Sequence, residues 1–358
     1  MMNGTETTTV QLRSGEKLMI EVCEPPFPGG EHSLCWWGDI AADLMAGNLR
    51  PWLYTPYYLG KIDGELVGYM GCQTPADTRE VGLVEFVWTA EAHRRKGIAS
   101  LLLGRLVEEF AQAGGLALYL CTANPHAGSL YERHGFRYFV GDGMRYLAPG
   151  AGDFDRDYLD GGSPAEVRDA TWADLPGASV LYNHPEPRWI VKDYLSQSFR
   201  DTRYESHFVK TLRRLEGRRG FCLALENAKR RLVGLATVER RGTFAEQHTG
   251  ILSFRVAPAF SGQAADLLGA VVERCTDLEI AVLHVYLADC DDDQKQLLEE
   301  AGFNEETRFK RRLWVDGRYV DMVVYGRPLA QTAAALFDEG YYYGGRKDWQ
   351  RERVGGTD

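Results

Sequence analysis

One loop of the sequence combines residue types that suit a bound pyrophosphate. A strand-like stretch ending at Trp88 runs into Arg94-Arg95-Lys96-Gly97-Ile98-Ala99-Ser100, an Arg-x-x-Gly-x-Ala pattern that opens a helix. Backbone N–H groups at a helix start form a concave donor array, and the helix dipole adds positive potential. Gly97 lets the backbone approach an anion, and the neighbouring cations add charge. Because so short a pattern arises often by chance, a solvated basic turn is the alternative.

A second segment follows the next strand-like stretch. Residues 124–136 read Asn-Pro-His-Ala-Gly-Ser-Leu-Tyr-Glu-Arg-His-Gly-Phe, with a short helix expected from Pro125 to His134 and a stop at Gly135. Together the two segments resemble the GNAT superfamily of N-acetyltransferases. The first resembles the family's acyl-CoA pyrophosphate loop, and the second its Asn-x-x-Ala-x-x-Leu-Tyr-Glu-x-x-Gly-Phe helix. The resemblance covers residues 87–136 in motifs and residues 17–148 in element order.

The resemblance implies where acetyl-CoA, or another acyl-CoA, would bind as cosubstrate. The strand ending near Val87 would diverge from the strand at 116–121, and the pantetheine arm would lie between them, bonded by backbone groups near Val87 and Thr89 and by Asn124. Arg94 would support the loop or a phosphate. The pyrophosphate would face the backbone N–H groups of Arg95, Lys96, Gly97, Ile98, Ala99 and Ser100.

Two residues are the candidates for catalysis. The resemblance implies that Tyr131 lies by the acyl-CoA sulfur and protonates the departing thiolate; the alternative is an aromatic residue of the core. Glu85 is the candidate base or amine anchor, because it lies two residues before Val87, on the same face of a regular strand, and a charge inside an apolar strand is unusual. The alternative for Glu85 is a side chain that reaches solvent or pairs with an arginine. The N–H of Val87 would stabilise the oxyanion.

The elements that must position these residues follow from hydrophobic periodicity and turn signals. Helices are expected at His32–Asn48 and at 98–113, the second ended by Gly114-Gly115. Strands are expected at 17–23, 54–61, 65–73, 80–88, 116–121, 136–140 and 143–148.

The chain then repeats itself at an offset of 167 residues. Gly135-Phe136 aligns with Gly302-Phe303, and one offset serves a strand, helix, strand and helix in both halves. We therefore predict an α+β fold with two GNAT-like units, each a mixed, mostly antiparallel twisted sheet flanked by helices. The expected organisation is a catalytic domain at 1–150, a linker at 151–163, a degenerate copy at 164–329 and a tail at 330–358.

The second copy has lost the residues that matter in the first. Ser261 replaces Arg94, Ala264 replaces Gly97 and Leu298 replaces Tyr131, while Asp291 stands at the position of Asn124. An aspartate, Asp266, near that helix start would repel a pyrophosphate. We expect the second copy not to bind acyl-CoA, and to shape the acceptor site or cover a surface of the first copy instead.

Aromatic residues surround the first expected helix. In a GNAT-like unit this region roofs the acceptor, and aromatic walls with Asp39 or Asp43 would suit a cationic amine. The alternative, favoured for most of them, is an amphipathic helix that buries its aromatic face. The aromatic residues are Trp36, Trp37, Trp52, Tyr54, Tyr57 and Tyr58.

The composition indicates which classes of partner and which compartment to expect. The net charge is −10 and neither half has a basic excess, which argues against nucleic acid or a membrane as the main partner. No apolar run is long enough for a membrane helix and no secretory signal is visible. Seven cysteines without a Cys-x-x-Cys pair suit reduced core thiols in the cytoplasm, and histidine spacing predicts no metal. A homodimer is left open.

Three functions fit these features. The first is an acyl-CoA-dependent N-acyltransferase, of acetyl type, in which the amine of a small molecule attacks the thioester directly. The second is a non-catalytic acyl-CoA-binding or scaffold protein. The third keeps the fold and changes the reaction to O-acylation or decarboxylation. The intact segment from Asn124 to Tyr131 favours an enzyme.

Overall fold

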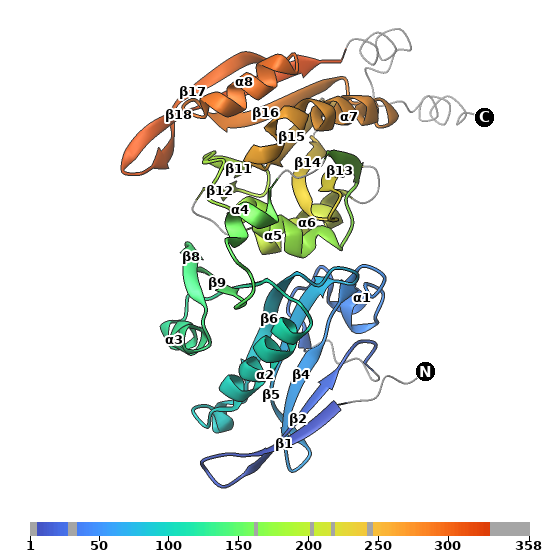
Figure 1. The fold of residues 1–358 in the computed structure, drawn as a ribbon. Coiled ribbons are helices and arrows are strands. Elements are labelled where there is room, and N and C mark those ends of the chain that lie inside the picture. Colours follow the sequence, from blue (N-terminus) through green and yellow to red (C-terminus); the bar gives the residue numbers. More distant parts are fainter. Residues whose placement is uncertain are drawn as a thin grey trace, which may run out of the picture.

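The computed structural model describes residues 6–27, 34–160, 164–200, 204–215, 219–241 and 246–329. These residues form two units, each built on one large sheet, and the units lie end to end (Figure 1). The expected tail at 330–358 lies outside the described residues. Within the described part of the chain, no helix is long and apolar enough to cross a membrane.

The first unit is a twisted sheet with helices on its faces. Its strand order is β1-β2-β4-β5-β6-β7-β9-β8, antiparallel except for the parallel pair β6–β7, and β3 pairs with β5. Its elements are β1 (Glu6–Gln11), β2 (Lys17–Cys23), α1 (Ala41–Met45), β3 (Leu53–Tyr54), β4 (Tyr57–Ile62), β5 (Glu65–Pro75), β6 (Val81–Thr89), η2 (Glu91–His93), α2 (Ile98–Gln112), β7 (Ala117–Cys121), α3 (Pro125–Arg133), β8 (Arg137–Val140) and β9 (Gly143–Leu147).

The second unit repeats that topology. Its sheet order, β10-β13-β14-β15-β16-β18-β17, matches the first sheet without β1 and has its one parallel pair, β15–β16, in the same place. Its elements are α4 (Phe154–Tyr158), β10 (Ala165–Asp169), α5 (Asp174–Asn183), β11 (Val191–Asp193), β12 (Ser198–Phe199), α6 (Glu205–Leu215), β13 (Gly220–Asn227), β14 (Leu232–Arg240), β15 (Thr249–Val256), η4 (Pro258–Gln263), α7 (Ala264–Asp277), β16 (Val282–Ala288), α8 (Asp292–Glu300), β17 (Asn304–Val315) and β18 (Arg318–Pro328).

The 167-residue offset holds in three dimensions. It carries α3 onto the bounds of α8, and it carries Gly135 onto Gly302, which share a left-handed backbone at φ 90° and 80°. Phe136 and Phe303, next in the chain, are both buried under their sheets. The expected α+β class, with two mixed and mostly antiparallel sheets flanked by helices, is confirmed.

One expectation about local structure needs correction, and a second segment contains more structure than its composition indicated. The helix predicted from His32 to Asn48 begins outside the described residues, and from residue 34 onward its only α-helical part is α1, with turns before Ala41 and after Met45. Part of the segment expected to be a linker folds as α4, in which Phe154 and Tyr158 are buried. Two such aromatics within an Asp- and Gly-rich stretch were enough to anchor the segment, since apolar burial outweighs its composition.

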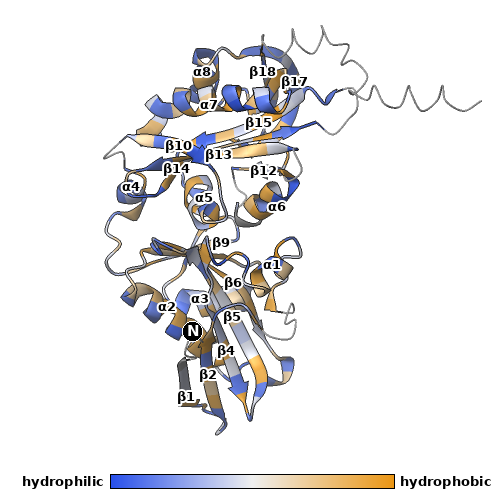
Figure 2. Ribbon diagram, turned by 90° about the vertical axis from the view of Figure 1, so that its right-hand side faces the viewer, coloured by the Kyte–Doolittle hydropathy of each residue, from blue (hydrophilic) through white to orange (hydrophobic). Residues whose placement is uncertain are grey.

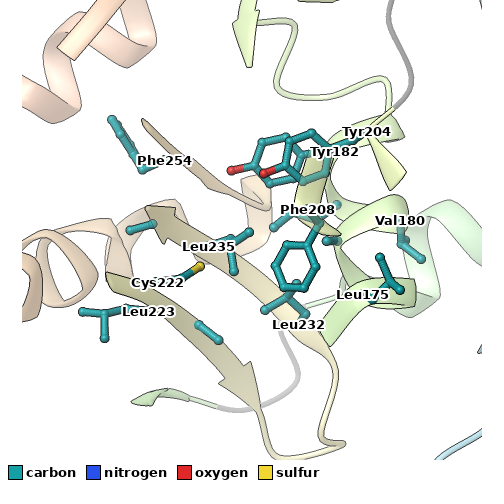
Figure 3. Close-up of a cluster of buried hydrophobic side chains, with 14 of the residues drawn as sticks. Leu175, Val180, Tyr182, Tyr204, Phe208, Cys222, Leu223, Leu232, Leu235 and Phe254 are labelled. Carbon is teal, nitrogen blue, oxygen red and sulfur yellow. The ribbon is translucent and has the colours of Figure 1, made fainter. Parts of the chain in front are cut away.

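Helix α5 joins the two units. Every residue of α5 is buried, and the helix packs on β14 and β15 of its own sheet and on β5 and β6 of the first (Figures 1 and 2). On the side of the second unit, Leu175, Val180 and Tyr182 meet side chains of β14 and α6 (Figure 3). One hydrophobic core therefore runs through both units.

Ion pairs add to this interface. Arg231, just before β14, donates from Nε and Nη2 to the two carboxylate oxygens of Glu80, at 2.7 and 2.9 Å. Arg213 of α6 pairs with Asp43 of α1. The paired arrangement of Arg231 and its carboxylate fixes orientation as well as contact.

Candidate active site

Strands β6 and β7 are paired over only part of their length. The parallel register joins Val81–Leu83 to Ala117–Tyr119, although β6 continues to Thr89 and β7 to Cys121. The strands therefore separate after Leu83. Of the predicted site residues, Glu85, Val87 and Thr89 lie beyond this point on β6, and Asn124 and Tyr131 follow the end of β7.

A bulge in β6 marks the divergence. Gly71 pairs with Glu85 but Tyr69 pairs with Trp88, so β6 has one extra residue there, and Phe86 adopts φ 59°. A non-glycine residue at positive φ is strained, and such bulges bend a strand and redirect its side chains. Phe86 is fully buried, which holds it in this conformation.

The bulge changes the predicted relation between Glu85 and Val87. Val87 packs against the hydrophobic cluster under α2, whereas Leu83 and Phe86 belong to the cluster on the other face of the sheet. Regular alternation does not survive the extra residue, so the argument that placed Glu85 and Val87 on one face is wrong. Spacing alone gave no sign of a bulge.

The loop before α2 forms a concave start to the helix. Arg95 has φ 64° and Gly97 has φ 89°, with Lys96 between them. The first bond at the helix start runs from the N–H of Leu101 to the carbonyl oxygen of Gly97, at 3.1 Å, so the amides of residues 98–100 precede the helical ladder. A Cβ at Gly97 would meet nothing within 4 Å, which leaves open space beside this backbone. The geometry fits an anion held by backbone amides.

Glycines below the helix let α2 approach the sheet. A Cβ on Gly68 would lie 3.0 Å from Cγ2 of Ile98, and one on Gly60 would lie 3.4 Å from the same atom. Ile98 is 1% exposed and opens α2. The helix start is thus fixed closely over β4 and β5.

Not all predicted loop side chains face outward. Lys96 Nζ lies 2.8 Å from Glu16 Oε1, and this contact holds the pKa of Glu16 below its usual range. Arg94 donates from Nε to the Thr89 carbonyl at 3.3 Å, and Ser100 shares a hydrogen bond of 2.8 Å with His134. Sequence reasoning missed Glu16, which lies in the turn before β2, and no local pattern connects residues so far apart.

The two key residues of the second motif, Asn124 and Tyr131, differ in exposure. Asn124 is the N-cap of α3 and is exposed; its Oδ1 accepts from the N–H of His126 at 3.0 Å. Tyr131 is 5% exposed and its ring lies 5.9 Å from that of Phe136. Burial raises the pKa of Tyr131 well above its ordinary value, and the Glu85 charge raises it further. The phenol is therefore protonated and close enough to Glu85 to feel its charge.

Glu85 is at the centre of a mostly apolar surrounding. It is 8% exposed, and its charge also contributes to the raised pKa values of Tyr57 and Cys35, for both of which burial is the main cause. Glu85 on β6 thus lies within electrostatic range of Tyr131 on α3. A buried carboxylate beside a buried phenol is the kind of pair that proton-transfer sites contain.

The aromatic residues predicted to roof the acceptor lie on both faces of the sheet. Trp36, Trp37 and Tyr57 surround Phe86, with ring centroids 5.2, 5.3 and 6.2 Å away, and Trp36 is 54% exposed. Tyr58 belongs to the opposite face, where its hydroxyl donates to Glu109 at 2.8 Å.

The remaining predicted acceptor groups have other contacts. Tyr54 lies under the guanidinium of Arg79. Asn48 and Arg213 both bind the carboxylate of Asp43 and lower its pKa. The backbone oxygen of Asp39 also accepts a hydrogen bond from Arg213. Asp43 is therefore committed to the contact between the units.

The second unit differs at the equivalent place. Strand β15 pairs with β14 without a register shift, so the bulge is missing. Strand β11 packs on β15 and β16, and the N–H of Ile190 donates to Asp291 Oδ2 at 2.8 Å. Trp189 lies edge-on to Phe254, 5.2 Å between ring centroids. Asp291, at the offset position of Asn124, thus binds a segment of the chain itself.

Asp291 provides a pH test of this arrangement. Burial raises its pKa to about 6, so the folded state holds a proton there that the unfolded state releases from about pH 4. Asp291 therefore lowers the free energy of unfolding as pH rises from about 4 to 6. We expect Asp291→Asn, which keeps an acceptor oxygen for Ile190, to gain in Tm relative to the wild type between pH 4.5 and 7.5. A difference in Tm that stays flat, like that of the exposed control Asp277→Asn, would contradict this.

Comparison with known proteins supports an assignment for part of the chain. The family model described as Acetyltransferase (GNAT) family matches residues 21–136, which is about a third of the chain. Among curated proteins, none is similar enough to count as a match.

Several solved structures resemble the chain over one unit. A GNAT superfamily phosphinothricin acetyltransferase from Sinorhizobium meliloti, solved with AcCoA, is 20% identical (TM-score 0.41; 47% of this chain, 89% of that one). A putative acetyltransferase from Salmonella typhimurium, solved with acetyl-CoA, is 18% identical (TM-score 0.40; 47% and 95%). A ribosomal-protein-alanine N-acetyltransferase from Brucella melitensis is 24% identical (TM-score 0.38; 46% and 99%).

The family match runs from within β2 to just past α3, and so includes the strand divergence, the loop before α2 and Tyr131. Residues 21–136 form an acetyltransferase domain of the GNAT family.

Proposed function

We propose that the chain is an acetyl-CoA-dependent N-acetyltransferase that acts on the amine of a small molecule. One observation carries the proposal: β6 and β7 separate beside a helix start whose first amides precede the helical ladder, and the buried Tyr131 lies within electrostatic range of Glu85. Bound acetyl-CoA supplies a thioester carbonyl as the acyl donor. Backbone amides of Arg95 to Ser100 bind its pyrophosphate, and groups near Val87 and Thr89 its pantetheine arm.

The chain's own residues then have distinct tasks. The N–H of Val87 stabilises the oxyanion that develops as the amine attacks the carbonyl carbon. Tyr131 gives its proton to the sulfur as the carbon–sulfur bond breaks, and its raised pKa keeps that proton available until then. Glu85 accepts the proton that the attacking nitrogen loses. Exchange of protons with solvent then returns Glu85 and Tyr131 to their starting states.

The acceptor would approach from the side of Trp36. Trp36, Trp37 and Tyr57 gather around Phe86, next to Glu85 in the chain, and aromatic faces with a carboxylate suit a cationic amine. In this proposal the unit at 1–150 is catalytic. The unit at 164–329 is a degenerate copy that binds no acyl-CoA, because segment 189–193 lies on β15 and β16. The cytoplasm, with its supply of acetyl-CoA, is the proposed compartment.

The test combines binding and turnover on the full chain. We expect acetyl-CoA to raise Tm, and free CoA to be released with at least one member of an amine library. Mass spectrometry of the product should show one added acetyl group on nitrogen. Stabilisation without any acyl transfer would support a binding or scaffold protein instead, and an O-acetylated or decarboxylated product would point to another reaction. No stabilisation by any CoA ester would contradict the proposal.

A further inference from the structure

A cavity of about 270 Å³ lies where the end of β8 meets the second unit. The first unit contributes residues 139–141, and the second contributes the segment after α5 and parts of β11 and β15. Four lining side chains are cationic and one is acidic. The charged lining residues are Glu186, Arg188, Lys192, Arg200 and Arg255. Such walls favour an anionic occupant.

Arg255 is buried, and its hydrogen bonds to the residues that the structure describes are all to backbone carbonyls. It is 1% exposed, and Nε donates to the Leu181 carbonyl at 2.8 Å. Nη2 donates to the carbonyls of His184 and Pro187, at 2.9 and 2.8 Å. Nη1 is buried and has no hydrogen-bond partner among the residues that the structure describes. Burial lowers the pKa of Arg255, and the charges of Glu186, Asp291 and Asp293 offset only part of this cost.

Arg200 has a similar unused donor. Nη1 pairs with Asp316 at 2.9 Å, and Nη2 donates to the Arg188 carbonyl at 3.1 Å. Its Nε is buried and, within the described part of the chain, lacks an acceptor. Two arginines that line one cavity therefore each have one buried N–H group without a hydrogen-bond partner among the described residues.

We propose that this cavity binds the oxyanion group of a small ligand, a carboxylate or a phosphate, through Arg200 and Arg255. Charge-assisted bonds from two separate arginines suit an anion with several acceptor oxygens. A helix-capping role explains Nε of Arg255, which meets the end of α5, but it leaves Nη1 and Arg200 unexplained. Phe139 and Trp189 add apolar wall for the rest of the molecule.

Such a ligand would tie the two units together. The cationic residues that line the cavity belong to the second unit, whereas Val140 and its neighbours belong to β8 and the turn that follows. Strand β8 follows Phe136, whose ring lies beside that of Tyr131. Binding should therefore raise the Tm of the whole chain, because the ligand stabilises only the folded state.

The experiment titrates the full chain with inorganic phosphate and with succinate at constant ionic strength. Calorimetry and thermal shift are run in a Gly97→Val background, so that the backbone amides of the loop before α2 do not contribute. We expect one or both probes to bind, and Arg200→Ala to weaken binding about tenfold or more, the size of a lost bond to a charged group. Val140→Trp, which fills the cavity from the first unit, should do the same. The exposed Arg156→Ala is the control.

The pattern of binding identifies the ligand class or contradicts the proposal. Binding of phosphate alone identifies a phosphorylated ligand, and binding of succinate alone a carboxylate. If neither probe binds, the proposal is wrong. It is also wrong if binding persists unchanged in both Arg200→Ala and Val140→Trp, because the anion then lies elsewhere. Arg200→Lys, which keeps the charge, serves if Arg200→Ala fails to fold.

Discussion

Replacing Tyr131 by phenylalanine should lower kcat about a hundredfold and leave the Kd for acetyl-CoA nearly unchanged. General acid catalysis typically contributes a factor of this order, and the substitution removes only the hydroxyl. The ring that packs on Phe136 stays in place. Steady-state kinetics with the amine found in the library, together with calorimetric titration of acetyl-CoA, measures the two quantities.

Tyr146 provides the matched control. It lies on Phe136 as well, with ring centroids 5.6 Å apart, and it is half-buried on β9. Tyr146→Phe should keep kcat within about twofold of the wild type, because it removes no proton that the reaction needs. If both variants lose activity equally, the hydroxyl of Tyr131 has no special role. If neither does, another group protonates the thiolate.

Substituting Gly97 by valine should remove acetyl-CoA binding while the protein stays folded. Gly97 has φ 89°, which a β-branched residue rarely adopts, so the loop must change its backbone. The new side chain would also fill the open space beside the amides. We expect the Kd for acetyl-CoA to rise about a hundredfold or more, in line with the loss of several charge-assisted bonds. Equilibrium titration measures it.

The control for this substitution carries the same backbone strain elsewhere. Gly317, in the turn between β17 and β18, has φ 73° and open space where a Cβ would be. Gly317→Val should cost a similar amount of Tm and leave acetyl-CoA binding intact. Unchanged binding in Gly97→Val would show that the loop before α2 does not hold the pyrophosphate.

The sequence was informative where local signals and topology agree. The strand at Lys17–Cys23 and the helix α8 follow from periodicity, and the offset of 167 residues predicted a second sheet with the same strand order. Gly97 and Gly135 were recognisable because a left-handed backbone after or before a helix favours glycine. Such features depend on neighbours in the chain.

What the sequence could not predict depends on distant residues. The bulge at Phe86 requires the partners of β5 and the aromatic rings that bury the side chain. The ion pair of Lys96 with Glu16 and the pairing of Asp43 with Arg213 join residues on separate elements. Charge in a sequence indicates what a side chain can bind, but only the fold determines which partner it meets.

The burial of α5 has a consequence for synthesis. The helix covers β5 and β6 of the first unit, yet it follows that unit's last strand, β9, in the chain. While the ribosome is still making residues beyond 147, the apolar surface around Leu83 and Phe86 has no cover from α5. Nascent chains stalled before Asp174 should therefore bind chaperones and precipitate when released. The stretch just after the first unit then determines how long that surface is exposed in the cell.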